Sequence, residues 1–204
     1  GRRYVEDALT RGAAAVVLEG PDLLEGRATP RVLVPSSREA LARLADAYFG
    51  HPSGKLTVIG ITGTNGKTTT SYLVDALLTA RGQRTGLIGT VQYRVGAEVI
   101  PAGQTTPEAV ELQSLLRRMV NAGVTAVAME VSSHALALSR VDGIDFDIAV
   151  FTNLTQDHLD FHETMDTYRE AKRRLFALLA AGLKSGRTAV VNADDPSGVS
   201  MVAG

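Results

Sequence analysis

The stretch VIGITGTNGKTTTSYLVDALL, residues 58–78, decides the fold. Its first four residues favour a β-strand, and a loop of Gly, Thr and Asn follows them. A lysine and three threonines then lead into an amphipathic apolar pattern that is typical of a helix. A Gly-rich turn between a strand and a helix points backbone N–H groups inward, and the helix N-terminus adds partial positive charge. The stretch therefore predicts a site for a phosphate chain.

Lys67 and Thr68 give this loop its expected chemistry. In P-loop proteins the lysine reaches the outer phosphates of a nucleotide, and the hydroxyl of the next residue binds Mg²⁺. The usual spacing, G-x-x-x-x-G-K-[ST], fails by one residue, because Ile61 stands six positions before Lys67 and the glycine is at position 60. A Gly-rich turn with a surface lysine is the alternative. The order of strand, NGKTTT and amphipathic helix favours the nucleotide site.

The composition is typical of a globular protein that acts on small molecules. The 204 residues are 45% hydrophobic and 21% charged, which suits one large domain or two small ones. A net charge of −1 argues against a broad nucleic-acid surface. The chain has no cysteine, so it has neither disulfides nor Cys-ligated zinc, and it suits the cytoplasm. No apolar run approaches the roughly 20 residues that cross a bilayer, and no signal peptide is visible, so we expect no membrane partner.

Residues 1–50 predict a small α/β unit. A helical pattern around 5–11 precedes an apolar run at 13–18, a turn-rich stretch through Pro21 and Gly26, and a strand at 31–34. Ser36 or Ser37 is expected to cap a helix over 38–49. The segment GHPSGK, residues 50–55, has the composition of a linker and is the expected domain boundary. Both ends of the sequence interrupt a pattern, so we expect a fragment of a longer protein.

Strands and helices alternate after this boundary. Strands are expected at 56–61, 85–89, 126–130, 148–151 and 188–191, with helices at 67–81, 107–122 and 165–181 and a short helical piece after 133. Near-continuous apolar segments such as AVAME and DIAVF are typical of parallel strands covered on both faces. The alternating segment VQYRVGAEVI, residues 91–100, predicts a hairpin around Gly96. The expected fold class is α/β, with a doubly wound, mostly parallel sheet of the P-loop type.

Polar side chains follow two of these strands. Glu130 ends the strand at 126–130, at the sheet edge where ligands of parallel sheets collect. Beside a P-loop its carboxylate would be a natural partner for Mg²⁺, which prefers oxygen ligands; a strand-end glutamate in solvent is the alternative. The next strand leads into NLTQDHLDFH, which brings Asn153, Asp157 and His158 to the same edge. Asp157 could equally cap a helix.

Five segments together resemble one protein family. They are GITGTNGKTT (60–69), TTPEA (105–109), MEVSSHAL (129–136), FTNLTQDHLDFH (151–162) and YREAKRRLF (168–176). Their order and approximate spacing resemble those of the Mur ligases, and among these the MurE type, the UDP-N-acetylmuramoyl-L-alanyl-D-glutamate amino-acid ligases of peptidoglycan synthesis. The resemblance implies that residues 1–50 end a UDP-binding N-terminal domain and that 51–204 form most of the central ATPase domain. It also implies that the family's C-terminal domain is absent.

The resemblance assigns the nucleotide site. It implies that ATP contacts Gly63, Thr64, Asn65, Gly66, Lys67, Thr68, Thr69 and Asn153. His158, in the motif DHLD, resembles the ligand of a second Mg²⁺. His162 has no such match, and His51 and His134 are expected to be structural.

Lys172 takes its expected role from the resemblance alone. In the helical run REAKRRL, residues 169–175, the residues themselves indicate a solvated basic face, and Arg173 and Arg174 are expected in solvent. In the family the lysine of this motif is carbamylated by CO₂, and the carbamate helps to hold the second metal ion. The modification is chemically reasonable, because an unmodified ammonium group would repel Mg²⁺.

The substrate side of the site is also implied by the resemblance. The family contacts UDP-MurNAc-L-Ala-D-Glu through Thr105, Thr106, Ser132 and Arg140, where Arg140 would pair with a carboxylate or phosphate. Capping of the next helix is the alternative or additional role for Thr106. Leu138 stands where the family often has Gln, so one polar contact is missing. Asn192 ends a further strand at the same edge, and the sequence assigns it no role.

The expected activity is ATP-dependent amide-bond formation. Lys67, Glu130, His158 and Lys172 would be its catalytic groups, with Mg²⁺ held by Thr68, Glu130, His158 and the carbamate of Lys172. The product would be the D-glutamyl residue joined to a diamino acid, either meso-diaminopimelate or L-lysine. The alternatives are a related ATP-dependent reaction such as folylpolyglutamate synthesis, and nucleotide binding without turnover.

Overall fold

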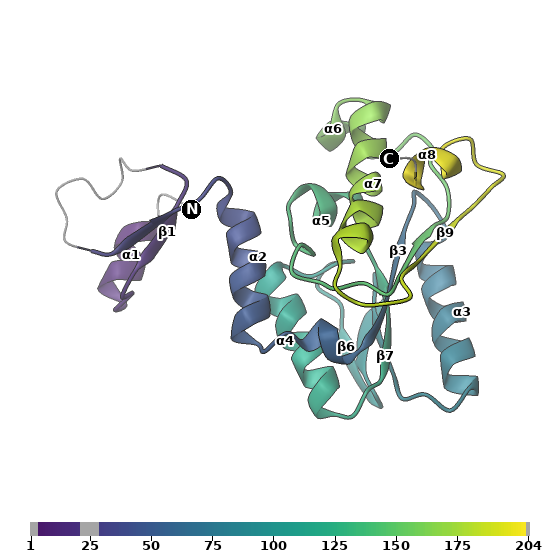
Figure 1. Ribbon diagram of the computed structural model, residues 1–204, viewed down its shortest axis with the longest axis horizontal. Coiled ribbons are helices and arrows are strands. Elements are labelled where there is room, and N and C mark those ends of the chain that lie inside the picture. The colour runs from purple at the N-terminus through teal and green to yellow at the C-terminus, as the bar shows by residue number, and fades with distance from the viewer. Residues whose placement is uncertain (1–3, 21–28, 203–204) are drawn as a thin grey trace.

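A seven-stranded sheet forms the centre of the part of the chain that the structure describes (Figure 1). The structure is a computed structural model, and it describes residues 4–20 and 29–202. The strand order is β6-β5-β4-β7-β3-β8-β9, in which β4, β7, β3, β8 and β9 run parallel and the β5–β6 hairpin is antiparallel. The predicted mostly parallel sheet and its hairpin are confirmed. The strands are β3 (Thr57–Thr62), β4 (Thr85–Ile88), β5 (Gln92–Val95), β6 (Glu98–Pro101), β7 (Ala126–Glu130), β8 (Ile148–Phe151) and β9 (Thr188–Val191).

Helices cover both faces of this sheet. On one face α3 packs its Val74 and Leu78 against Ile59 and Ile61 of β3. On the other face α4, α5 and α7 enclose the larger core, to which Val58 of β3 belongs (Figure 1). Successive side chains of a strand point to opposite faces, so one strand serves both cores. The helices are α3 (Lys67–Ala80), α4 (Ala109–Asn121), α5 (Ser133–Ala137), α6 (Leu159–His162), α7 (Met165–Ala181) and α8 (Gly198–Val202).

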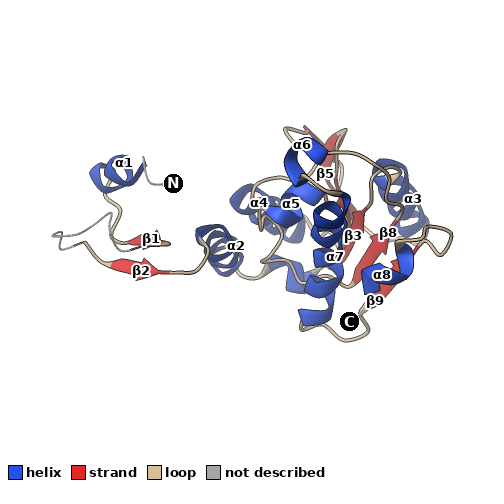
Figure 2. Cartoon of the chain, turned by 90° about the horizontal axis from the view of Figure 1, so that it is seen from above, coloured by secondary structure: helices blue, strands red, loops and turns tan. Residues whose placement is uncertain are grey.

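The N-terminal part forms a separate small unit, apart from the large sheet (Figure 2). It consists of α1 (Val5–Thr10) and a parallel pair of strands, β1 (Val16–Leu18) and β2 (Arg31–Leu33). α2 (Ser37–Tyr48) follows, capped by Ser36, and packs against α4. The expected turn-rich stretch through Pro21 and Gly26 lies outside the described residues. The assignment of 1–50 to a UDP-binding domain stays a prediction.

The expected linker at 50–55 is more ordered than its composition suggested. Residues Pro52–Lys55 form the 3-10 helix η3, in which Pro52 and Ser53 are buried. Oγ of Ser53 accepts a hydrogen bond from the N–H of Asp145 at 3.1 Å, which ties this segment to the approach to β8. In the described part of the chain, no helix is both long enough and apolar enough to span a bilayer.

The register of the parallel strands brings three loops to one edge of the sheet. Ile61 of β3 pairs with Glu130 of β7, and Thr62 pairs with Phe151 of β8. The segments that follow these three strands therefore leave the sheet side by side. In open parallel sheets this edge is where ligands bind.

Candidate active site

The loop at 63–66 joins β3 to α3 and requires two glycines. Gly63 and Gly66 have φ angles of +150° and +83°, which other residues rarely adopt. A Cβ atom on Gly63 would also lie 1.9 Å from Oγ1 of Thr152. Because the first turn of α3 has backbone N–H groups without intrahelical acceptors, the loop and the helix together can bind an anion.

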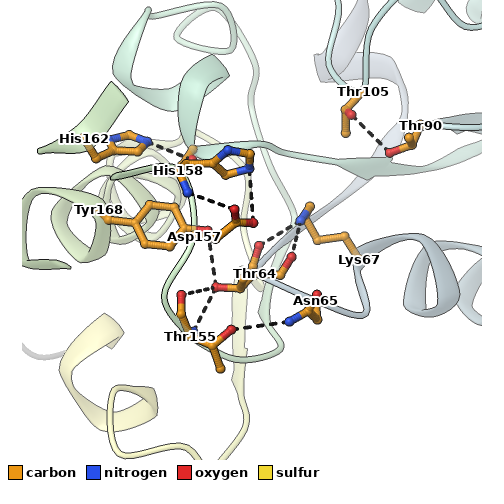
Figure 3. Close-up of polar contacts among 12 residues, drawn as sticks. Thr64, Asn65, Lys67, Thr90, Thr105, Thr155, Asp157, His158, His162 and Tyr168 are labelled. Atoms are coloured by element: carbon orange, nitrogen blue, oxygen red, sulfur yellow. Dashed lines mark hydrogen bonds and ion pairs between the residues drawn. The ribbon is translucent and has the colours of Figure 1, made fainter. Parts of the chain in front are cut away.

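The segment after β8 holds this loop in place. The N–H of Thr64 donates to the carbonyl oxygen of Asn153 at 2.8 Å. The Asn153 side chain bonds Asn65 twice, since Oδ1 accepts from the Asn65 N–H at 3.0 Å and Nδ2 donates to the Asn65 carbonyl at 3.1 Å. Oγ1 of Thr64 also accepts from the N–H of Thr155 at 3.0 Å (Figure 3). Asn153, an expected ATP contact, thus lies against the loop and fixes its shape.

Glu130 is buried at the end of β7 among hydrogen-bond donors. It is 1% exposed. Oε2 accepts from the hydroxyls of Thr68 and Thr90, each at 3.0 Å, and Oε1 accepts from the N–H of Thr90 at 3.0 Å. A buried carboxylate is tolerated only when donors replace its water, as these do. The structure therefore places Glu130 beside Thr68, as expected, and not in solvent.

Gly89 and Thr90 are site residues that the sequence reasoning missed. Thr90 supplies two of the donors to Glu130, and a Cβ atom on Gly89 would lie 2.3 Å from Oε1 of that carboxylate. Both follow β4, which pairs with β7 so that Ile88 lies opposite Met129. The sequence contains the strand end, but the strand order was needed to put it next to Glu130.

A partly buried lysine and a buried one share one acceptor. Nζ of Lys67 donates to the carbonyl oxygens of Gly63 at 2.9 Å and Thr64 at 2.8 Å. Nζ of Lys172, from α7, donates to the same Gly63 oxygen at 2.8 Å and lies 4.2 Å from the centre of the Tyr168 ring. Lys172 is 1% exposed. The interpretation of Lys172 as part of a solvated basic face is therefore wrong.

Burial lowers the pKa of both lysines. Desolvation and the charge of Lys67 lower the pKa of Lys172 to about 7, against the attraction of Asp157. Desolvation also lowers the pKa of Lys67, while Glu130 and Asp157 oppose the shift. Lys172 therefore loses its proton near neutral pH and becomes a nucleophilic amine.

His158 borders the site from the start of α6. Its φ is +53°, and its Nε2 lies 3.4 Å from Oδ2 of Asp157 (Figure 3). His158 itself occupies the N-cap position of α6, so the interpretation of Asp157 as a helix cap is wrong. Its ring lies edge-on to that of His134, with 4.9 Å between centroids. Nε2 of His162 lies 2.9 Å from Oγ of Ser133, and burial lowers the pKa of both His134 and His162, which suits the structural role expected for His134.

The two adjacent threonines have different partners. Oγ1 of Thr105 lies 3.1 Å from Oγ1 of Thr90 (Figure 3). Thr106 is 1% exposed and donates to the carbonyl oxygen of Glu130 at 2.8 Å, while its oxygen accepts from the N–H of Ser132 at 3.1 Å. Thr105 thus faces the open side of the site, and Thr106 fixes the loop to β7.

Arg140 is bound to the same loop. It donates to Oε1 of Gln104 at 2.6 Å and to the carbonyl oxygen of Thr106 at 3.1 Å, and it pairs with Glu108 at 2.6 Å. A substrate anion would have to compete with Glu108 for this guanidinium. Glu108 also occupies the N-cap position of α4, so the prediction that Thr106 caps this helix is wrong.

Most of the expected site residues line one polar cavity of about 250 Å³. Gly63, Thr69, Thr106, Asn153 and Arg140 lie outside its lining. Ser133 and Tyr168 belong to it although the sequence reasoning gave them no role. The lining consists of Thr64, Asn65, Gly66, Lys67, Thr68, Thr90, Thr105, Glu130, Ser132, Ser133, His158, Tyr168 and Lys172.

The side chains that line this cavity can bind a divalent cation only together with additional oxygen ligands. Within the described ranges, no three His, Cys, Asp or Glu side chains gather as a ready-made metal site. The cavity offers the carboxylate of Glu130, the hydroxyl of Thr68 and the imidazole of His158. Since Mg²⁺ prefers six oxygen ligands, phosphate oxygens or a new oxygen group on Lys172 would complete the set.

A larger cavity, of about 870 Å³, lies between α7, α8 and β9. Its basic residues include Lys184, which pairs with Asp147 at 2.6 Å, and Arg174, which pairs with the buried carboxylate of Asp142. Arg174, which was expected in solvent, is partly exposed and ion-paired. Because these cations already have partners, we place the chemistry in the smaller cavity.

Asn192 acts locally at the end of β9. Its Nδ2 donates to the carbonyl oxygen of Thr152 at 2.9 Å, and its Oδ1 accepts from the N–H of Asp194 at 3.1 Å. It thereby ties the end of β9 to the segment that supports the loop at 63–66.

Comparison with known proteins agrees with this geometry. Residues 61–203 match the family model described as Mur ligase middle domain. The chain belongs to the Mur ligase family. The resemblance found in its motifs is thereby confirmed.

Similar proteins in this family are considerably longer than the chain. A UDP-N-acetylmuramoyl-L-alanyl-D-glutamate–2,6-diaminopimelate ligase from Geobacillus kaustophilus is 52% identical over 198 residues, which are 96% of this chain and 40% of that protein. A solved structure of a ligase with the same name has a TM-score of 0.84 at 36% identity and covers 98% of this chain and 39% of its own. The MurF ligase from Thermotoga maritima in complex with ADP has a TM-score of 0.54 at 25% identity, over 98% and 42% of the two chains. The chain thus spans about 40% of the length of the curated Mur ligases it matches.

Gly89→Ala tests the packing of the Glu130 carboxylate in this Mur ligase domain. We expect it to lower the free energy of unfolding by about 1–3 kcal/mol, because the new methyl group overlaps Oε1. Gly103→Ala is the matched control, since a Cβ atom there meets nothing within 4 Å. Chemical denaturation of both variants measures the difference. If the Glu130 contact is the cause, Gly89→Ala costs less in a Glu130→Ala background; an equal cost in both backgrounds would contradict this explanation.

Proposed function

We propose that this chain is the ATP-binding middle part of a MurE-type ligase that joins a diamino acid to the D-glutamyl residue of UDP-MurNAc-L-Ala-D-Glu. The observation that carries the proposal is the position of Glu130. Its carboxylate accepts from Thr68 of the nucleotide loop, and its carbonyl oxygen accepts from Thr106 of the expected substrate loop. One residue therefore links the two halves that such a ligase must bring together. The similarity to relatives named 2,6-diaminopimelate ligases favours meso-diaminopimelate over L-lysine.

ATP activates the carboxylate, so that one of its oxygens can be replaced by an amine nitrogen. A carboxylate oxygen is a poor leaving group, so the γ-carboxylate of D-glutamate first attacks the γ-phosphorus of ATP, and ADP leaves. The amine nitrogen of the diamino acid then bonds to the acyl carbon, phosphate leaves, and the nitrogen loses a proton. Lys67 stabilises the negative charge of the transferring phosphoryl group and is not itself modified.

Mg²⁺ would supply positive charge that neutralises the phosphate oxygens. Thr68, Glu130, His158 and carbamylated Lys172 would hold the ions. The shared acceptor of Lys67 and Lys172 supports the carbamate, because two ammonium groups on one carbonyl oxygen repel each other. The Lys172 ammonium first loses a proton; the neutral nitrogen then bonds to the carbon of CO₂ and releases a second proton, which would leave a carbamate anion in place of one of these cations.

The remaining contacts divide between the two substrates. The loop at 63–69 and Asn153 would bind ATP, and the hydroxyls of Thr105 and Ser132 would meet the UDP-linked dipeptide from the opposite wall of the cavity. Thr106, which does not line the cavity, would hold Ser132 in place through its hydrogen bond with the Ser132 N–H. Arg140 would pair with a carboxylate or phosphate of the substrate by exchanging its partner Glu108.

The first experiment measures ligation by the full-length protein with UDP-MurNAc-L-Ala-D-Glu and either meso-diaminopimelate or L-lysine. Phosphate release and the UDP-tripeptide are followed by mass spectrometry. We expect one phosphate per tripeptide, with meso-diaminopimelate as the preferred amino acid. Turnover with a folate and glutamate instead would favour the folylpolyglutamate alternative. Tight Mg·ATP binding without either product would contradict the proposed substrate.

Lys67→Ala tests the nucleotide loop by itself. Loss of a charged hydrogen-bond donor facing the phosphates should weaken Mg·ATP binding at least about 10-fold in calorimetric titration. The fold should persist, as judged by circular dichroism. Lys55→Ala, at an exposed position before β3, is the control and should bind normally. Equal affinity in wild type and Lys67→Ala would refute the assignment.

Carbamylation of Lys172 is measurable without turnover. Incubation with ¹³C-bicarbonate should give a carbamate signal in the NMR spectrum of the wild type, lost in Lys172→Arg and retained in Lys55→Arg. The reacting form is the neutral amine, which predominates above the pKa of about 7. The signal should therefore grow as the pH rises from about 6 to about 8. A signal that persists in Lys172→Arg would place the carbamate elsewhere.

A further inference from the structure

The β5–β6 hairpin reaches the active site through one side chain. Tyr93, in the middle of β5, is 1% exposed and packs in the larger core. It pairs with Ile88 of β4 on one side and with Ile100 of β6 on the other. Its backbone is therefore fixed by the sheet on both sides.

The Tyr93 hydroxyl holds both backbone groups of Gln104. It donates to the carbonyl oxygen of Gln104 at 2.6 Å and accepts from the N–H of the same residue at 3.2 Å. Burial raises the pKa of this hydroxyl, so it keeps the proton that it donates. Gln104 immediately precedes Thr105, whose hydroxyl borders the cavity.

The loop at 102–108 is thus held at defined points on two sides. Tyr93 fixes the backbone of Gln104 from the hairpin, and Arg140 fixes its side chain from the segment after α5. Between these anchors, Thr105 lies against Thr90, which in turn donates to Glu130. If the Tyr93 anchor is lost, this loop, which carries Thr105 and Thr106 and is called the threonine loop below, keeps its Arg140 contacts, but the backbone of Gln104 can shift.

We propose that Tyr93 is a positioning residue, which sets the place of Thr105 and Thr106 and thereby the affinity for the UDP-linked substrate. The β5–β6 hairpin then has two roles, since it forms one edge of the sheet and also supports the binding of this substrate. This inference rests on the proposed function, because it assumes that the threonine loop meets that substrate. It concerns KM for one substrate and leaves the nucleotide loop, which follows β3, unchanged.

Tyr93→Phe in the full-length protein removes the hydroxyl and keeps the ring in the core. We expect KM for UDP-MurNAc-L-Ala-D-Glu to rise about 3- to 10-fold, because part of the free energy of the two lost hydrogen bonds to Gln104 is lost from substrate binding, with kcat and KM for ATP within about twofold. The N–H of Gln104 should also exchange faster with deuterium, since its acceptor is gone. Tyr72→Phe, on the partly exposed face of α3, is the matched control. It should change neither KM for the UDP-linked substrate nor the exchange of the Gln104 N–H.

The outcomes separate this inference from the proposed function. Wild-type turnover combined with an unchanged KM for the UDP-linked substrate in Tyr93→Phe would overturn the positioning role alone. A merely structural role predicts a lower melting temperature and an equal loss for both substrates, which would also overturn it. Absence of wild-type turnover with this substrate would overturn the proposed function and the inference together.

Discussion

The carbonyl oxygen of Gly63 accepts hydrogen bonds from two lysines, one partly and one fully buried, and the rest of the site is arranged around that contact. Lys67 approaches it from the start of α3 and Lys172 from α7, so one oxygen joins the two helices that flank the loop. The oxygen is available only because Gly63 has no Cβ atom to collide with Thr152. The same glycine lets the segment at 152–155 approach closely enough to hold Thr64 and Asn65. The shape of the loop at 63–66 and the positions of Lys67 and Lys172 therefore depend on the same glycine.

The two lysine ammonium groups repel each other and need nearby negative charge, which is unevenly distributed between them. Lys67 feels the charges of Glu130 and Asp157, while Lys172 has Asp157 alone and is opposed by Lys67 itself. Desolvation is the main cause that lowers the pKa of Lys172 to about 7, and the repulsion by Lys67 adds to it, so Lys172, rather than Lys67, is the amine suited to modification. The Tyr168 ring beside Nζ offers the ammonium form only a weak cation–π attraction, which is smaller than the cost of burying the charge.

The sequence predicted what is local and missed what depends on neighbouring strands. Apolar strands, the Gly-rich loop and the hairpin at Gly96 follow from residue patterns, and each is present in the fold. Glu130 could be placed at the sheet edge because it ends a parallel strand. Thr90 could not, because its contact with Glu130 depends on β4 lying beside β7 rather than beside β3. Thr106 was expected to cap a helix for the same reason, since the nearer acceptor, the Glu130 carbonyl, comes from a distant segment.

Glu130 lies where the proposed nucleotide half and the proposed substrate half of the site meet, and its buried hydrogen bonds hold the two halves rigidly together. Its carboxylate has hydroxyl donors from Thr68 on the nucleotide loop and from Thr90, which also contacts Thr105 on the substrate loop. A shift of either threonine would leave a buried carboxylate short of a donor, which is costly. Thr68 donates to Glu130 from the start of α3, independently of Thr90, so a small shift of Thr105 leaves the bond between Thr68 and Glu130 in place. Glu130 thus holds the two halves at a fixed distance without any movement of the sheet, because each donor is held by a different strand end or helix start.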